Sequence, residues 1–217
     1  MLSDWFFWRK RWPHISSEEI RKRARLLVID DQDFPYGVLF DRDGYNVDTW
    51  HDVERLAELD DGKYDLVLLD LHGVGRRDST EQGFGILKYL KRRCPTVLVV
   101  AYSDSDWGLR YQEFFRLADA VFPKSADYVD FKARVDALLA DRFSLGFYVQ
   151  KVLAEVAPYE ADPAYLTTLT QKAILTGRTQ RLRSRLETIV PRDSAAIIER
   201  VLTIVKVAIG IAELWSR

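Results

Sequence analysis

The sequence has little of several residue types on which small proteins often depend. Its 217 residues include one cysteine, Cys94, so no internal disulfide can form, and no metal-ligand spacing surrounds it. The chain also has no large excess of positive or negative charge, since 32 Lys and Arg nearly balance 33 Asp and Glu. No electrostatic field of the whole molecule therefore favours binding to nucleic acid. With 47% hydrophobic and 30% charged residues, the chain is neither collagen-like nor disordered. The single cysteine fits a reducing compartment, so we expect a compact cytoplasmic protein.

Residues 1–23 form an aromatic and basic segment followed by a short helix. Residues 5–8 read WFFW and are followed by the basic run RKR and Trp12. In a secretory signal the charges precede a long apolar run, so this segment is not expected to be one. An interfacial membrane anchor and packing onto another helix of the same chain are both compatible with this composition, and we expect packing. The spacing of Ser16 and Glu19 predicts a capped helix from there to about Arg23.

Residues 24–142 alternate short apolar runs with longer segments of helical spacing. The apolar runs predict strands at 26–29, 65–71, 96–102 and 118–122, with a weaker candidate at 45–49. The intervening segments predict helices at about 35–42, 53–59, 83–93, 107–117 and 128–142. This alternation predicts an α/β domain, a parallel sheet covered by helices.

Polar residues stand where these strands end, at the sheet edge where ligands bind in open α/β folds. They are Asp30, Asp31, Asp70, Ser103 and Lys124. Two carboxylates about 4 Å apart repel by roughly 4 kcal/mol at an effective dielectric near 20, so a cation is expected among them. Magnesium joins carboxylates to phosphate groups, and Asp31 and Asp70, with Asp30 through water, would suit it. Lys124 could neutralise a phosphoryl oxygen, and Asp70 could act as the nucleophile.

At these residues the chain resembles the receiver domain of two-component response regulators. The motifs are LLVIDDQD at 26–33, YDLVLLDLHG at 64–73, TVLVVAYSDSD at 96–106 and ADAVFPKSAD at 118–127. The resemblance covers residues 24–142 and implies a doubly wound, five-stranded, flavodoxin-like sheet.

The resemblance also implies a role for each edge residue. Asp70 would accept a phosphoryl group, with Lys124 on the phosphoryl oxygens and Ser103 as the hydroxyl switch. Mg²⁺ would be held by Asp30, Asp31, Asp70 and the backbone carbonyl of His72. The phosphoryl group would come from a sensor histidine kinase or a phosphotransfer protein. The chain would then be a phosphoacceptor that promotes its own phosphorylation and dephosphorylation, rather than an enzyme with a separate substrate.

The chain departs from the family pattern mainly in the parts that transmit the signal. The loop at 72–82 is longer than usual and lacks the familiar proline, and Lys124 is followed by Ser125 where the family has proline. Val121 occupies the position of the usual aromatic, with Phe122 one place later. An alternative alignment puts Val100 instead of Ser103 at the hydroxyl position.

Residues 143–217 are predicted to be entirely helical, as an output or dimerisation region. The predicted helices are 144–156, 164–176, 180–189 and 194–215. The last is strongly apolar, and its charges Glu199, Lys206 and Glu213 mark one narrow polar stripe. A small bundle, a homodimer core or a partner's groove could cover the apolar positions, and we expect a bundle or a homodimer. Membrane contact is not favoured, since Lys206 lies near the middle of the apolar run.

The segment 178–185, RTQRLRSR, is the one basic patch in this half of the sequence. Such a patch could bind the phosphates of nucleic acid, which makes a DNA-binding transcriptional regulator an alternative function. No helix-turn-helix pattern is recognisable around it, so nucleic acid is not favoured as the partner. A third possibility is a non-phosphorylated, receiver-like interaction adaptor.

Overall fold

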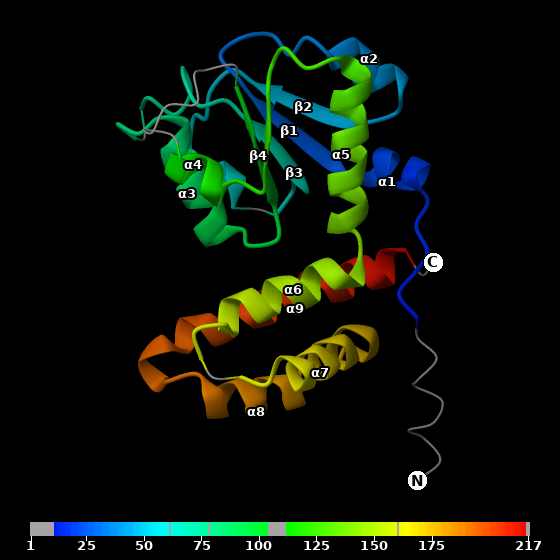
Figure 1. Cartoon of the computed structure of the whole chain (residues 1–217), viewed down its shortest axis with the longest axis vertical. Coiled ribbons are helices and arrows are strands. Elements are labelled where there is room, and N and C mark those ends of the chain that lie inside the picture. Colours follow the sequence, from blue (N-terminus) through cyan, green and yellow to red (C-terminus); the bar gives the residue numbers. More distant parts are fainter. Residues whose placement is uncertain (1–10, 61, 78, 104–111, 160, 216–217) are drawn as a thin grey trace. The chain divides into compact units, whose positions relative to one another are not determined.

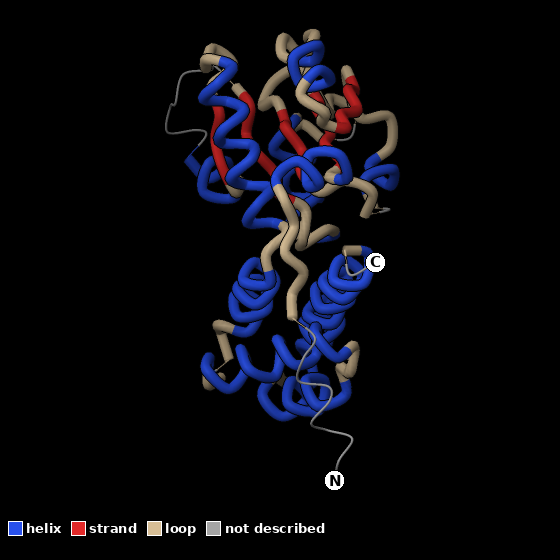
Figure 2. Tube along the Cα trace, turned by 90° about the vertical axis from the view of Figure 1, so that its right-hand side faces the viewer, coloured by secondary structure: helices blue, strands red, loops and turns tan. Residues whose placement is uncertain are grey.

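The computed structural model describes residues 11–60, 62–77, 79–103, 112–159 and 161–215 (Figure 1). Its contacts divide the chain into two compact units. The α/β unit is Ser16–Arg142, and the helical unit combines Met1–Ile15 with Phe143–Arg217. Figure 2 shows strands in the first unit and only helices and loops in the second.

The α/β unit is built on one parallel sheet. Its strands are β1 (Arg25–Ile29), β2 (Asn46–Trp50), β3 (Leu66–Leu69), β4 (Leu98–Tyr102) and β5 (Ala120–Phe122). They lie in the order β2-β1-β3-β4-β5, and every neighbouring pair is parallel. This is the flavodoxin-like order, in which the strand sequence reverses direction beside β1. The predicted fold class is therefore confirmed.

Helices cover both faces of this sheet. They are α1 (Ser17–Arg23), α2 (Gly37–Arg42), α3 (Gly83–Arg93), α4 (Gln112–Leu117) and α5 (Tyr128–Arg142). Figure 1 shows α3 and α4 on one side of the sheet and α5 on the other. The predicted capping box is present at the start of α1, where Ser16 and Glu19 satisfy each other's backbone N–H groups. The predicted helix at 107–117 is described only from Gln112.

The helix predicted at 53–59 is wrong. The segment contains only a 3-10 turn, η2 (Leu56–Leu59), and Arg55 before it has an extended backbone. Asp52 explains the difference, because its carboxylate accepts hydrogen bonds from the backbone N–H of Val53 and from that of Gly75 in another loop. Such side-chain bonds compete with the hydrogen bonds that start a helix.

Continuous apolar strands give the sheet two buried faces, as expected for a parallel sheet. Leu27 and Ile29 pack with Ile86 and Leu90 of α3 in one core cluster. The opposite face holds a group of contacting aromatic rings, namely Phe34, Phe40, Tyr102, Phe122 and Phe131. Two packed layers thus fix the sheet, and with it the edge where the strands end.

The helical unit confirms the all-helical prediction. Its helices are α6 (Leu145–Val156), α7 (Pro163–Thr176), α8 (Gln180–Ile189) and α9 (Ala195–Leu214), with a short 3-10 turn, η4 (Arg192–Ser194), before α9. The apolar α9 packs against α6, α7 and α8, which bury its residues Val201, Leu202, Ile204, Val205 and Ala208. Glu199, Lys206 and Glu213 are exposed, as the polar stripe predicted. The bundle alternative is therefore observed within a single chain.

The described part of the N-terminal segment packs onto this bundle. The indole N–H of Trp12 donates to the carbonyl of Phe143 at 2.8 Å, and its ring lies 5.9 Å from that of Tyr148. Residues 5–10, which carry the remaining aromatics and most of the basic run, lie outside the described residues. Among the described helices, none is both long and apolar enough to cross a membrane.

Candidate functional site

Three carboxylates meet at the carboxyl edge of the sheet. Asp30 follows β1 and Asp70 follows β3, and the pairing of Ile29 with Leu69 in neighbouring strands brings these two acids side by side. Asp30 is 3% exposed and Asp70 is 4% exposed, whereas Asp31 is open to solvent. One oxygen from each of the three carboxylates lies within 4.8 Å of the others.

Lys124 joins this cluster from the loop after β5. Its ammonium Nζ lies 2.7 Å from Asp30 Oδ2 and 2.8 Å from Asp70 Oδ2. Burial raises the pKa of Asp70 above its ordinary value, although Lys124 acts in the opposite direction. Burial also lowers the pKa of Lys124, but its bonds to Asp30 and Asp70 outweigh this, so the pKa of the ammonium is raised. The lysine therefore stays charged between two carboxylates.

The second oxygen of Asp70 is held by the backbone. Asp70 Oδ1 accepts hydrogen bonds from the N–H of Leu71 at 2.7 Å and from that of His72 at 3.4 Å. Both carboxylate oxygens thus have donors, which fixes the orientation of a side chain that would act as a nucleophile. The proposed use of the His72 carbonyl as a metal ligand stays a prediction.

Ser103 lies at the same edge, directly after β4. It is 4% exposed, and its backbone N–H donates to the carbonyl of Phe122 at 3.1 Å. Val100 lies inside β4, paired with Leu68 and Ala120, and is fully buried. Of the two alignments, the one that uses Ser103 therefore puts a hydroxyl residue at the strand end.

The donor set fits a magnesium ion. Asp30, Asp31 and Asp70 offer oxygen ligands and three negative charges, which Lys124 neutralises only in part. Gly73 closes the site beside Asp31, since a Cβ atom added at Gly73 would lie 2.0 Å from Asp31 Oδ2. Its φ of +84° is a second reason why glycine is needed there.

Two residues of this neighbourhood were missed from the sequence. Asp52, after β2, accepts a hydrogen bond from the N–H of Gly75, and Gln82, before α3, accepts one from that of Gly73. Both therefore hold the long loop between β3 and α3. The glycines at 73 and 75 were visible in the sequence, but nothing there connects them to Asp52 or Gln82.

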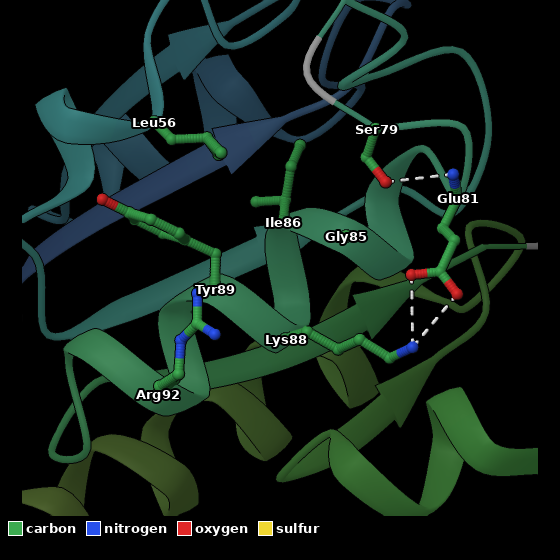
Figure 3. Close-up of a pocket in the computed structure, with 8 residues that line it drawn as sticks. All are labelled: Leu56, Ser79, Glu81, Gly85, Ile86, Lys88, Tyr89 and Arg92. Atoms are coloured by element: carbon green, nitrogen blue, oxygen red, sulfur yellow. Dashed lines mark hydrogen bonds and ion pairs between the residues drawn. The ribbon is translucent and has the colours of Figure 1, made fainter.

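A groove of about 400 Å³ lies over α3 (Figure 3). It is lined by Leu56, Ser79, Glu81, Gly85, Ile86, Lys88, Tyr89 and Arg92. None of the residues predicted at the sheet edge lines it, so it is not part of the candidate site.

The basic patch of the helical unit is partly used by contacts within the chain. Leu182 and Leu186 are the buried positions of α8, so the arginines lie on its flanks. Arg183 pairs with Glu199 of α9 at 3.0 Å, and the Arg185 guanidinium lies 5.7 Å from the centre of the Tyr165 ring. This arrangement does not favour the nucleic-acid alternative.

Comparison with known proteins gives likenesses in structure only. No protein-family model matches the sequence, and no curated protein matches it. The CheY-like response regulator receiver domain protein from Methanospirillum hungatei JF-1 is 19% identical, with 55% of this chain and 95% of that chain covered and a TM-score of 0.45.

Two further structures show the same level of likeness. Response regulator TrrA from Thermotoga maritima, in complex with Mg²⁺-BeF, is 22% identical over 53% of this chain and 98% of that chain, with a TM-score of 0.43. NtrX from Brucella abortus, in complex with ATP, is 20% identical over 70% of this chain and 40% of that chain, with a TM-score of 0.46. Likenesses of this degree concern the fold alone. The strand order and parallel pairing of residues 25–122 themselves give this chain the fold of a response regulator receiver domain, followed by a helical region.

Proposed function

We propose that this protein is a response regulator whose Asp70 accepts a phosphoryl group from a histidine kinase or a phosphotransfer protein. The observation that carries the proposal is the cluster at the sheet edge, in which three carboxylates lie within 4.8 Å of one another and Lys124 contacts two of them. The protein would be a phosphoacceptor that promotes its own phosphorylation, not an enzyme with a separate substrate.

The residues present can perform each part of this transfer. An oxygen of Asp70 attacks phosphorus, a P–O bond forms, and the P–N bond of a phosphohistidine breaks with its electron pair leaving on the imidazole. Asp30 and Asp31, together with Asp70, would hold Mg²⁺, which when bound would offset charge on the transferring group. Lys124, already 2.8 Å from Asp70 Oδ2, would neutralise a phosphoryl oxygen. The Ser103 hydroxyl would follow the new charge and carry the change to the surface around β5.

The helical unit is proposed as the output module, acting through a second copy of the chain or another protein partner. Its described residues contain no cluster of metal-binding side chains, so its role is expected to be contact rather than chemistry. Most of the apolar face of α9 is already covered within one chain, although Leu214 is exposed, so a homodimer would use the exposed surface of the bundle. Oligomeric state, measured with and without a phosphodonor, tests this part.

The acceptor itself is tested by the intact mass of the protein after incubation with a small phosphodonor. One phosphoryl adduct is expected with Mg²⁺, and none in Asp70→Asn or when the metal is chelated. Asp43→Asn is the matched control, because Asp43 is a carboxylate of the same unit that pairs with Lys132 at 2.9 Å, on α5. No adduct on the folded wild-type protein would contradict the proposal and favour the adaptor alternative.

A further inference from the structure

The loop between β3 and α3 packs directly onto the acid cluster. The backbone of Gly73 lies against the Asp31 carboxylate so closely that a Cβ atom there would be 2.0 Å from Oδ2 and 2.3 Å from Cγ. Asp31 is the exposed member of the three carboxylates, and backbone donors to Asp70 come from the start of this same loop. The position of Gly73 therefore limits where the Asp31 oxygens can lie.

Gln82 holds Gly73 in this position at a conformational cost. Its side-chain oxygen Oε1 accepts a hydrogen bond from the N–H of Gly73 at 3.1 Å. Gln82 has φ 55° and ψ −133°, and it is the one non-glycine residue with positive φ in the described part of the chain. Glycine adopts such a conformation without strain, whereas a side chain there is strained. Glutamine, unlike glycine, has a carboxamide that can accept the hydrogen bond from Gly73.

A second side chain holds the loop from a different part of the fold. Asp52, in the segment after β2, accepts a hydrogen bond from the N–H of Gly75 at 2.5 Å and one from Val53 at 2.8 Å. Two backbone N–H groups of the loop, two residues apart, are thus bound by one acceptor from the end of the loop itself and one from the segment after β2. The loop is fixed at Gly73 and at Gly75, next to the carboxylate that it confines.

We propose that Gln82 and Asp52 are positioning residues for the acid site: they hold the β3–α3 loop so that Gly73 keeps the Asp31 carboxylate in place to bind a divalent cation. This rests on the proposed function, since it concerns the magnesium site of that reaction. Neither residue contacts the cation. They would act by fixing the position of the Asp31 carboxylate, in the way that residues around a metal site commonly orient the metal ligands.

The test measures Mg²⁺ affinity by calorimetry and thermal stability without metal, in the full chain. Gln82→Gly removes the carboxamide and the strain together, so the Kd for Mg²⁺ is expected to rise by about tenfold. The Tm of the metal-free protein should equal or exceed that of the wild type, because strain is relieved. Ser79→Ala is the matched control: it removes an acceptor for the Glu81 N–H in the same loop, on the side that faces α3 (Figure 3), and should leave the Kd unchanged.

Asp52 offers a conservative rescue. Asp52→Ala should weaken Mg²⁺ binding, while Asp52→Asn keeps an oxygen for the Gly75 N–H and should restore it. A Kd for Gln82→Gly within about twofold of the wild type would overturn the proposal, as would a loss of affinity that comes only with a lowered Tm. If wild type and Gln82→Gly bind Mg²⁺ equally, this inference alone fails. If the wild type binds no Mg²⁺, the metal site of the proposed function fails as well.

Discussion

The α/β unit and the helical unit bury different kinds of side chain. Among the described residues, the buried polar and charged side chains of the α/β unit are Asp30, Asp70, Thr96, Ser103 and Arg142, and the helical unit has one, Thr170. Three of the five lie directly after β1, β3 and β4, at the carboxyl edge of the sheet. The core of the helical unit is formed mainly by apolar side chains, with α9 packed against α6, α7 and α8.

This difference suits the two units to different proposed roles, phosphoryl transfer in the α/β unit and protein contacts in the helical unit. Burying a charge is costly unless it is paired, so a buried acid cluster needs compensating groups such as Lys124 and a cation. Burying apolar side chains in a bundle carries no such cost and contributes stability. We propose that residues 16–142 perform phosphoryl transfer and that residues 143–217 make contacts with a protein partner. Four substitutions test that division, in order of decreasing effect.

Lys124→Met should have the largest effect, on chemistry. Removal of the ammonium takes away the one described cation that contacts both Asp30 and Asp70, and phosphoryl transfer to Asp70 should slow by about 10²–10³-fold. The rate of adduct formation, followed by intact mass, measures this. Lys132→Met is the control, since this lysine pairs with Asp43 instead. Equal rates in wild type and Lys124→Met would remove the lysine from the mechanism.

Leu202→Ala should act on stability alone. Leu202 is 2% exposed in the core of the helical unit, and its truncation should lower the free energy of unfolding by about 3 kcal/mol. Thr203→Ala, an exposed neighbour on α9, is the control and should cost little. Urea unfolding measures the first effect, and adduct formation under native conditions should be unchanged. Loss of the adduct in a folded Leu202→Ala protein would break the proposed division.

Asp136→Asn should lower the stability of the fold by a smaller amount, and this loss should depend on pH. Burial raises the pKa of Asp136, but the hydrogen bonds from Arg21 and Tyr45 outweigh it, and the pKa lies below the ordinary 3.8. Arg21 donates from Nε at 2.9 Å and from Nη2 at 2.6 Å, a bidentate ion pair that should contribute about 1 kcal/mol. Because the folded pKa is depressed, this stability is present above pH 3.8 and is lost as the pH falls through the folded pKa.

The measurement is the Tm of wild type and Asp136→Asn between neutral and acidic pH. The two curves should differ at pH 7 and converge at low pH. The prediction fails if the difference in Tm stays constant down to the lowest pH at which the protein folds. The charge of Asp136 would then not be what stabilises the packing of α1 against α5.

Arg183→Ala should have the smallest effect. Its ion pair with Glu199 is solvent-exposed and should contribute about 0.3 kcal/mol or less to stability. Chemical denaturation should therefore barely distinguish it from the wild type, and adduct formation should be unaffected. A large loss of stability would show that the packing of α8 depends on this ion pair as well as on the burial of Leu182 and Leu186.

The sequence predicted features that depend on periodicity and on parallel-sheet geometry. Continuous apolar runs located four of the five strands, and the weaker candidate at 45–49 corresponds to β2. The carboxyl ends of β1 and β3 placed Asp30 and Asp70 at one edge. The polar stripe of α9 predicted that Glu199, Lys206 and Glu213 would be exposed. It did not predict that Leu214 would be exposed as well, nor which helices would cover the buried positions.

Features that depend on side-chain bonds between loops were not predictable. The helix expected at 53–59 was wrong because Asp52 binds Gly75, 23 residues further along the chain. Gln82 was missed for a similar reason, because its role depends on a turn that returns it to Gly73. No spacing rule in the sequence predicts such contacts, since the loop between β3 and α3 has no regular period.

The most direct test of the central claim is to locate the phosphoryl group. After incubation with Mg²⁺ and a phosphodonor, reduction with borohydride converts a phosphorylated aspartate into homoserine, which peptide sequencing by mass spectrometry can place. The tryptic peptide 64–76 contains both Asp65 and Asp70, so it carries its own internal control. Homoserine at position 70 alone is the predicted result. Homoserine at Asp65, Asp30 or Asp31, or at no aspartate of the folded protein, would contradict the account.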